Sequence, residues 1–237
     1  MASLNDQRVL VVGGSSGIGL AVAGQAAAAG AKVTIASRSA DKLADAVKEL
    51  HGNVDSVSLD TGDEAGINAF FASRDPWDHV VVSAAQTPGG PIRKLSLEDA
   101  KSAMESKFWG AYRIARAARF TERGTLTFIS GFLSERPSAT SVLQGAINAA
   151  LEGLGRGLAL ELSPVRVNTV SPGVINTPLW SKMDAESREA MFKRVAASLP
   201  AKTIGQPSDV ANAVLFALTT PFATGSTIRV DGGGIIG

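Results

Sequence analysis

The chain has 237 residues, of which 45% are hydrophobic and 19% charged, a composition typical of a globular protein with a sizeable core. Its formal net charge of +1 gives no electrostatic footprint for nucleic acid, and no apolar run reaches the roughly 18 residues that span a bilayer. The absence of cysteine excludes disulfides, thiolate metal sites and cysteine nucleophiles, and two histidines are too few for a histidine-rich metal site. We therefore expect a cytoplasmic protein with no metal and with no nucleic-acid or membrane partner.

Short apolar runs that predict strands alternate along the chain with longer helical patterns. In chain order, the pattern predicts strand Arg8–Val12, helix Ile18–Ala29, strand Lys32–Ala36, helix Asp41–Leu50, strands Val54–Leu59 and His79–Ser83, helix Ser96–Phe120, strand Thr125–Ile129, helix Thr140–Leu162, strand Arg166–Val170, helix Pro207–Leu218 and strand Ser226–Val230. Strands and helices that alternate in this way indicate right-handed βαβ units. The fold class is therefore α/β, a Rossmann-type doubly wound parallel sheet of about seven strands with helices on both faces.

No break in composition divides the chain, so we expect a single domain over residues 1–237. The one long insertion between a strand and a helix is the segment Pro178–Gly205, which carries Trp180, Met183 and Phe192. It is either a lid over a substrate site (residues 178–205) or a helical excursion that only packs against the domain. Its aromatic residues and methionine suit an apolar ligand, but an amphipathic helix that packs explains them equally well.

A glycine-rich run follows the first strand directly and opens an alanine-rich helix. A sharp turn from strand to helix needs glycine, and the helix N-terminus presents free N–H groups to phosphate. The run therefore predicts a pyrophosphate loop whose contacts are Gly13, Ser15, Ser16, Gly17, Ile18 and Gly19.

The end of the second strand indicates which dinucleotide is bound. An acidic residue there would hold a ribose 2′-hydroxyl, but the sequence has Ser37 and Arg38, a hydroxyl and a cation that suit a 2′-phosphate. Asp60 and Thr61 follow the third strand, where a carboxylate can accept from the adenine amino group. We therefore expect NADP rather than NAD, and hence a single NADP-binding domain.

At this point the sequence resembles the short-chain dehydrogenase/reductase family over essentially its whole length. The resemblance rests on the spacing of Gly13, Gly17 and Gly19, on Asp60, and on the runs Arg166–Gly173 and Gly225–Gly233. It implies further cofactor contacts after the fourth strand and, to the nicotinamide, after the sixth: Ser83, Ala84, Ala85, Pro172, Gly173, Val174, Ile175 and Thr177. It also implies a small-molecule substrate and a homo-oligomer, either a tetramer or a dimer.

The catalytic positions depart from the family pattern of Ser, Tyr and Lys with an Asn on the preceding helix. In the register set by the helix Leu151–Leu162, Gly131 falls at the Ser position with Ser130 beside it, Gln144 at the Tyr position and Asn148 at the Lys position. Lys107 falls where the Asn is expected. The only tyrosine, Tyr112, lies five residues beyond Lys107 and therefore points to a different side of its helix.

These departures remove the group that moves a proton in the family. Gln144 can donate a hydrogen bond but cannot titrate, and Asn148 can bind ribose hydroxyls but carries no charge. Lys107 is the best substitute cation, because the family's Asn position adjoins its Lys position, and burial can lower its pKa enough for it to act as an acid. Positional candidates for catalysis are thus Lys107, Ser130, Gln144 and Asn148.

Three functions stay open from the sequence. The first is an NADP(H)-dependent oxidoreductase with a non-standard site that acts on an unidentified carbonyl or hydroxyl substrate. The second is a catalytically inactive NADP(H)-binding sensor or a non-catalytic partner subunit. The third, a lyase or isomerase that reuses the pocket, ranks last because acid–base groups are scarce.

Overall fold

The computed structural model describes residues 3–237 and contains a seven-stranded parallel sheet in the order β3-β2-β1-β4-β5-β6-β7. Its strands are β1 (Arg8–Val12), β2 (Lys32–Ser37), β3 (Val54–Ser58), β4 (Trp77–Val82), β5 (Phe120–Ile129), β6 (Arg166–Pro172) and β7 (Thr227–Val230). Every neighbouring pair is parallel. The chain therefore has the predicted doubly wound order, which reverses direction between β1 and β4.

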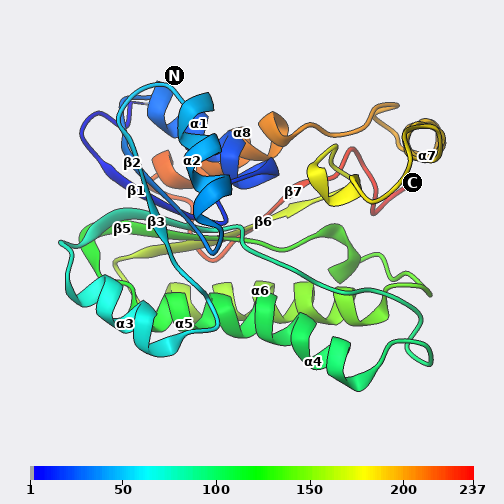
Figure 1. Cartoon of the computed structure of the whole chain (residues 1–237), viewed down its shortest axis with the longest axis horizontal. Coiled ribbons are helices and arrows are strands. Elements are labelled where there is room, and N and C mark those ends of the chain that lie inside the picture. Colours follow the sequence, from blue (N-terminus) through cyan, green and yellow to red (C-terminus); the bar gives the residue numbers. More distant parts are fainter. Residues whose placement is uncertain (1–2) are drawn as a thin grey trace.

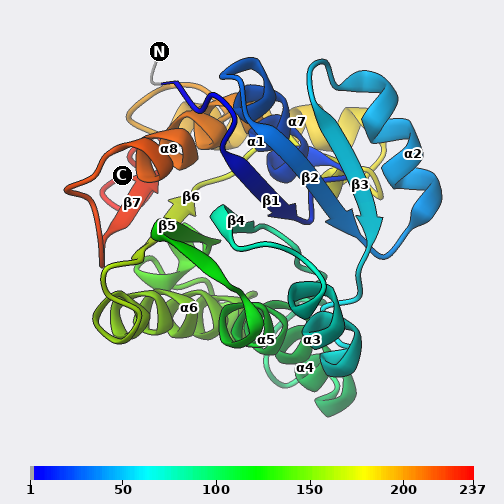
Figure 2. The same cartoon turned by 90° about the vertical axis from the view of Figure 1, so that its left-hand side faces the viewer.

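Helices cover both faces of the sheet (Figures 1 and 2). One face carries α1 (Gly17–Ala28), α2 (Ala40–Glu49) and α8 (Pro207–Thr219), and the other carries α3 (Glu64–Ala72), α4 (Leu97–Met104), α5 (Gly110–Ala117) and α6 (Val142–Glu161). The helix α7 (Ala185–Ser198) lies beyond the carboxyl ends of the strands, to one side in Figure 1. The layers are those of the predicted Rossmann-type fold.

The central strands are buried on both faces because their side chains alternate between two cores, whereas the edge strands β3 and β7 have no fully buried residue. Val9 and Val11 of β1 pack under α1 and α8, while Leu10 and Val12 pack on the opposite side against α5 and α6. All four are at most 1% exposed. Burial of such a side chain stabilises the fold by about 1.5–3 kcal/mol, which explains why near-continuous apolar runs mark these strands.

Two differences from the sequence-based prediction concern helices. The helix α3 was not predicted, although Asp63 accepts from the Gly66 N–H as its N-cap, a start signal that the sequence contains. The predicted helix Ser96–Phe120 is α4 followed by a π-helical turn, η1 (Glu105–Trp109), and by α5, and it ends at Ala117. It ends early because Ala118 is extended and Phe120 already pairs with Trp77 of β4, so β5 is longer than expected.

His79 is a structural residue in the middle of the sheet. It lies on β4, is 5% exposed, and its two ring nitrogens are hydrogen-bonded to Gln7 Oε1 at 2.7 Å and Thr125 Oγ1 at 2.8 Å. Burial lowers the pKa of the imidazole from 6.5 to about 4. His79 is therefore neutral in the folded protein, and its role is structural and not catalytic.

This burial makes stability depend on pH. Between pH 4 and pH 6.5 the imidazole of His79 binds a proton in the unfolded chain but not in the folded chain. The free energy of unfolding is therefore not reduced by this group above about pH 6.5 and decreases as the pH falls toward 4. We expect the free energy of unfolding from urea titrations to fall by about 2 kcal/mol between about pH 7.5 and about pH 5. The variant His79→Gln should lose this dependence, whereas His51→Gln, at an exposed histidine, should keep it. An unchanged pH dependence in His79→Gln would assign the effect to other groups.

Candidate cofactor and catalytic site

The loop between β1 and α1 has the shape that a pyrophosphate needs. Gly13 has a φ of +88°, and a Cβ there would lie 2.5 Å from the Ala84 backbone nitrogen; a Cβ on Gly19 would collide with the Gly13 carbonyl. Ser16 begins α1 without a side-chain hydrogen bond to the helix, which leaves the first N–H groups open to a ligand. The loop therefore fits the phosphate-binding turn of a dinucleotide site.

The predicted adenosine contacts lie at the carboxyl ends of neighbouring strands. Arg38, exposed after β2, donates from Nη2 to Gln86 Oε1 at 2.7 Å, and Gln86 belongs to the loop after β4. Because β1 lies between β2 and β4, this hydrogen bond reaches across the end of β1 beside the phosphate loop. Asp60, after β3, accepts from its own turn at Gly62 N. These residues, with Ser37, Thr61 and Ser83–Ala85, share one edge of the sheet.

The segment after β6 reaches the same edge. A Cβ on Gly17 would lie 3.5 Å from the Thr177 side chain, so Thr177 borders the phosphate loop. The two ends of the segment 178–205 are joined by backbone contacts. Ile175 forms a parallel β-bridge with Gly205, and the Asn176 N–H donates to the Gly205 carbonyl at 2.9 Å. Within this segment, α7 has no fully buried residue among those described.

The structure brings the four positional candidates for catalysis together. Lys107 Nζ donates to Asn148 Oδ1 at 2.7 Å and to the Ser130 carbonyl at 2.8 Å, while Gln144 Nε2 donates to Asn148 Oδ1 at 3.3 Å. Gly131 lies at the same place, because a Cβ on it would be 2.8 Å from Asn148 Nδ2. The register inferred from spacing therefore corresponds to one cluster at the end of β5 and the start of α6.

Lys107 is held inside the protein by the π-helical turn η1. Such turns shift the helical register locally and are frequent at functional sites. Lys107 is only 8% exposed, whereas Tyr112, five residues on, is 40% exposed and packs edge-to-face on Trp109. Burial lowers the pKa of the Lys107 ammonium to about 8, and the nearby carboxylate of Glu152 opposes that shift.

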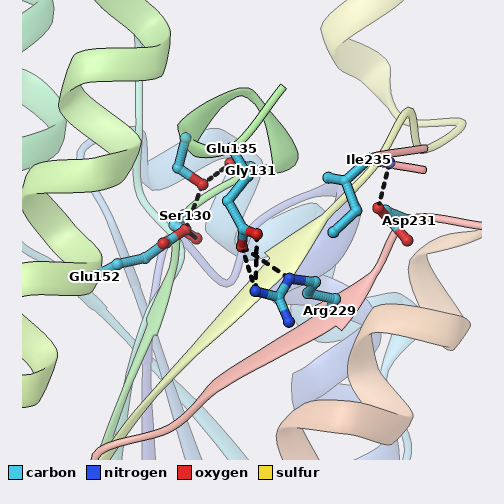
Figure 3. Close-up of polar contacts among 8 residues, drawn as sticks. Ser130, Gly131, Glu135, Glu152, Arg229, Asp231 and Ile235 are labelled. Atoms are coloured by element: carbon cyan, nitrogen blue, oxygen red, sulfur yellow. Dashed lines mark hydrogen bonds and ion pairs between the residues drawn. The ribbon is translucent and has the colours of Figure 1, made fainter. Parts of the chain in front are cut away.

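The hydroxyl of Ser130 is bonded to Glu152 of α6, and Figure 3 shows these two residues beside each other. Its hydroxyl donates to Glu152 Oε1 at 2.9 Å, and the Ser134 hydroxyl donates to the same oxygen at 2.7 Å. Only the backbone carbonyl of Ser130 contacts Lys107. Sequence reasoning missed Glu152, although it lies four residues after Asn148 and so on the same face of α6, which is the signal that identifies it.

Glu135 and Arg136, in the loop after β5, are both bonded to the C-terminal part of the chain. Glu135 forms a two-pronged ion pair with Arg229 of β7, with Oε1 to Nε and Oε2 to Nη2 distances of 2.7 and 2.8 Å (Figure 3). Arg136 donates to the Gly234 carbonyl. Both contacts connect the loop after β5 to the C-terminal segment and so leave these groups engaged within the protein.

Within residues 3–237, no group of three or more acidic or histidine side chains is arranged to hold a metal ion. Across those same residues, no helix combines the length and apolar character needed to cross a bilayer.

Comparison with known proteins places these features in a family. The family model described as enoyl-(acyl carrier protein) reductase matches residues 12–234. The chain is similar to short-chain dehydrogenase/reductase ATR9 of Stachybotrys chlorohalonatus, with 34% identity over all of both chains, and to D-erythrulose reductase of Gallus gallus, with 30% identity over 99% of this chain and 98% of the other.

Solved structures agree with these relatives. A small-chain dehydrogenase in complex with NADPH superposes with a TM-score of 0.82 at 34% identity, and the match covers 98% of this chain and 100% of the other. Family model, relatives and structure cover nearly the whole chain and include both the phosphate loop and the residues after β6. The chain is a member of the short-chain dehydrogenase/reductase family.

Proposed function

We propose that the chain is an NADP(H)-dependent oxidoreductase of a carbonyl or hydroxyl substrate, with a non-standard site in which Lys107 supplies both the positive charge and the proton. The observation that carries the proposal is the buried ammonium of Lys107, which is bonded to Asn148 and to the Ser130 carbonyl at the family's catalytic position. Family positions for Ser, Tyr and Lys are occupied by Gly131, Gln144 and Asn148, none of which titrates.

The cofactor half of the proposal rests on the phosphate loop and on Arg38. A relative at 34% identity has been solved in complex with NADPH, and Arg38 lies at the end of β2, where a 2′-phosphate needs a cation. The residues that would hold the cofactor are those predicted from Gly13 to Thr177. When bound, the nicotinamide supplies or accepts a hydride.

The protein's own groups would position and protonate the substrate oxygen. Two of the three N–H groups of the Lys107 ammonium are engaged by Asn148 and Ser130, and the third is left for an oxygen in the site. A pKa of about 8 keeps the ammonium protonated at neutral pH yet makes it a stronger acid than an ordinary lysine. The Gln144 amide, which borders Asn148, can orient the same oxygen by hydrogen bonding.

We assign the apolar part of the substrate to a small cavity whose lining does not include Lys107, Gln144 or Asn148. It has a volume of about 160 Å³ and is lined by the loop after β5, the segment after β6, α7 and the C-terminal segment. Phe132, Val174, Val195 and Leu199 contribute its apolar surface. Because α7 forms one wall without burying any of its residues fully, the proposal includes segment 178–205 as a substrate lid.

The proposal also includes a homo-oligomer and a cytoplasmic location. Trp109, the last residue of η1, is 43% exposed and packs on Tyr112 of α5, which is 40% exposed, and large exposed aromatic side chains suit an interface between subunits. The lack of cysteine suits a reducing compartment. The alternative, an NADP(H)-binding sensor or partner subunit, would bind the cofactor tightly but turn over no carbonyl.

The 2′-phosphate contact is tested at Arg38. Arg38→Ala should weaken NADPH binding by about 10–100-fold, because it removes a charge-assisted hydrogen bond, and should change NADH binding less than about threefold. Cofactor fluorescence titration measures both dissociation constants. Arg123→Ala, at an exposed arginine of β5, is the matched control and should change neither. An equal loss for both cofactors would overturn the assignment of Arg38 to the phosphate.

The proton source is tested at Lys107. Lys107→Met should lower carbonyl reduction by about 10²–10⁴-fold and leave the NADPH dissociation constant within about threefold, because it removes the acid but not the phosphate loop. In the unmodified protein the rate of reduction should fall as the pH rises through about 8, where the ammonium deprotonates. Lys101→Met, at an exposed lysine of α4, serves as the control. Cofactor binding without turnover of any carbonyl in the unmodified protein would favour the sensor instead.

Restoring the Ser, Tyr and Lys residues of the family tests whether the family's substrate pocket is still present in this chain. Gly131→Ser, Gln144→Tyr and Asn148→Lys together would place a second ammonium at the 2.7 Å contact of Lys107 with Asn148, so we expect this triple variant to unfold at lower temperature. Adding Lys107→Asn should recover thermal stability and raise carbonyl reduction above that of the unmodified protein. A stable quadruple variant without that gain would mean that the pocket itself has been remodelled.

A further inference from the structure

Glu152 is a buried carboxylate without a direct cationic partner. It lies on α6, is 6% exposed, and accepts hydrogen bonds on Oε1 from the hydroxyls of Ser130 and Ser134 (Figure 3). No ion pair joins it to a lysine or arginine in the part of the chain that the structure describes. A buried charge of this kind is costly unless hydrogen bonds and a nearby opposite charge compensate for it.

The compensating charge is on the other side of Ser130. Ser130 binds Glu152 through its hydroxyl and Lys107 through its carbonyl, so one residue separates the buried carboxylate from the buried ammonium. Asn148 and Glu152 are one helical turn apart on α6, and Lys107 contacts the former. The two hydroxyls hold the carboxylate on the Ser130 side instead of letting it turn toward solvent.

Other charges near Glu152 are engaged elsewhere or exposed. Glu152 borders an open cavity of about 450 Å³ whose other charged residues are Glu135, Arg156 and Arg229. Arg229 is held by Glu135, and Arg156 is exposed on α6. On η1 itself, Glu105 is paired with Arg113. Lys107 and Glu152 are therefore two buried groups of opposite charge. Because neither has a neutralising partner of its own among the residues that the structure describes, the electric field of each acts on the other.

We propose that Glu152 is a positioning residue that keeps Lys107 charged inside the site, with Ser130 and Ser134 fixing its carboxylate. The inference rests on the proposed role of Lys107 as the proton source, but the interaction between the two charges exists whether or not the protein is a reductase. It follows that the carboxylate of Glu152 extends the pH range over which Lys107 remains an ammonium.

The test removes the negative charge of Glu152 and keeps the shape of its side chain. Glu152→Gln should lower the pH at which Lys107 loses its proton by about one unit, because the neighbouring carboxylate opposes the lowering of the pKa of this buried lysine. NMR titration of protein labelled at the lysine Cε, with the resonance assigned through Lys107→Met, measures this directly. The basic limb of the reduction rate should move with it: a rate about tenfold lower near pH 9, and unchanged within about twofold near pH 6.

Two further variants make the result specific. Glu135→Gln removes a carboxylate that lines the same cavity but does not bind Ser130, and it should leave the Lys107 titration in place. Glu152→Asp keeps the charge and should keep most of the titration. If Glu152→Gln does not fold, Ser130→Ala, which releases the carboxylate toward the cavity, should shift the Lys107 titration in the same direction by about half a unit.

The outcomes separate this inference from the proposed function. A Lys107 titration that is the same in Glu152→Gln, or in Ser130→Ala if that is the variant that folds, overturns the inference, whatever the activity. A shifted titration in a protein that reduces no carbonyl supports the inference and overturns the proposed proton source. A shifted titration whose size is matched by Glu135→Gln would mean that the cavity's total charge, and not Glu152, sets the protonation of Lys107, and would also overturn the inference.

Discussion

The ammonium of Lys107, bonded to the Ser130 carbonyl and to Asn148, connects three elements that are far apart in the sequence: the π-helical turn η1, the end of β5 and the start of α6. A buried cation must have its hydrogen bonds satisfied, so these elements are held in one relative position by the same group that we propose for chemistry. The two serines and Glu152 extend this polar cluster along α6. This polar cluster is therefore organised around one buried charge.

The cofactor half depends on a different constraint, which is the parallel sheet. Parallel strands bring all their carboxyl ends to one edge, and the reversal of strand order between β1 and β4 leaves a crevice there. The phosphate loop, Arg38, Asp60 and the segment up to Thr177 meet at this edge although they are spread over much of the chain. These contacts share only Asn148, the expected ribose contact, with the Lys107 cluster.

Sequence reasoning located the cofactor half well because its signals are local. Gly13 and Gly17 have positive φ, a Cβ on Gly19 would collide with the Gly13 carbonyl, and the strands β1 and β4 are compact apolar runs followed at once by predicted site residues. It also grouped four positional candidates that the structure brings together, because the spacing from Gly131 to Gln144 and the pattern of helix α6 relate them in the sequence. It did not find α3, and it extended the helix before β5 too far, because strand pairing of Phe120 with Trp77 overrides local helical propensity.

The sequence by itself determined the fold class, the glycine-rich phosphate loop and the cation at the end of β2. Each of these follows from residue type and short-range spacing. Only the tertiary structure decided that Lys107 is buried and bonded to Asn148, and that the Ser130 hydroxyl is bonded to Glu152. The physical reason is that burial and the field between two charges depend on which elements pack together, and residues 107, 130 and 152 meet only when η1, β5 and α6 do.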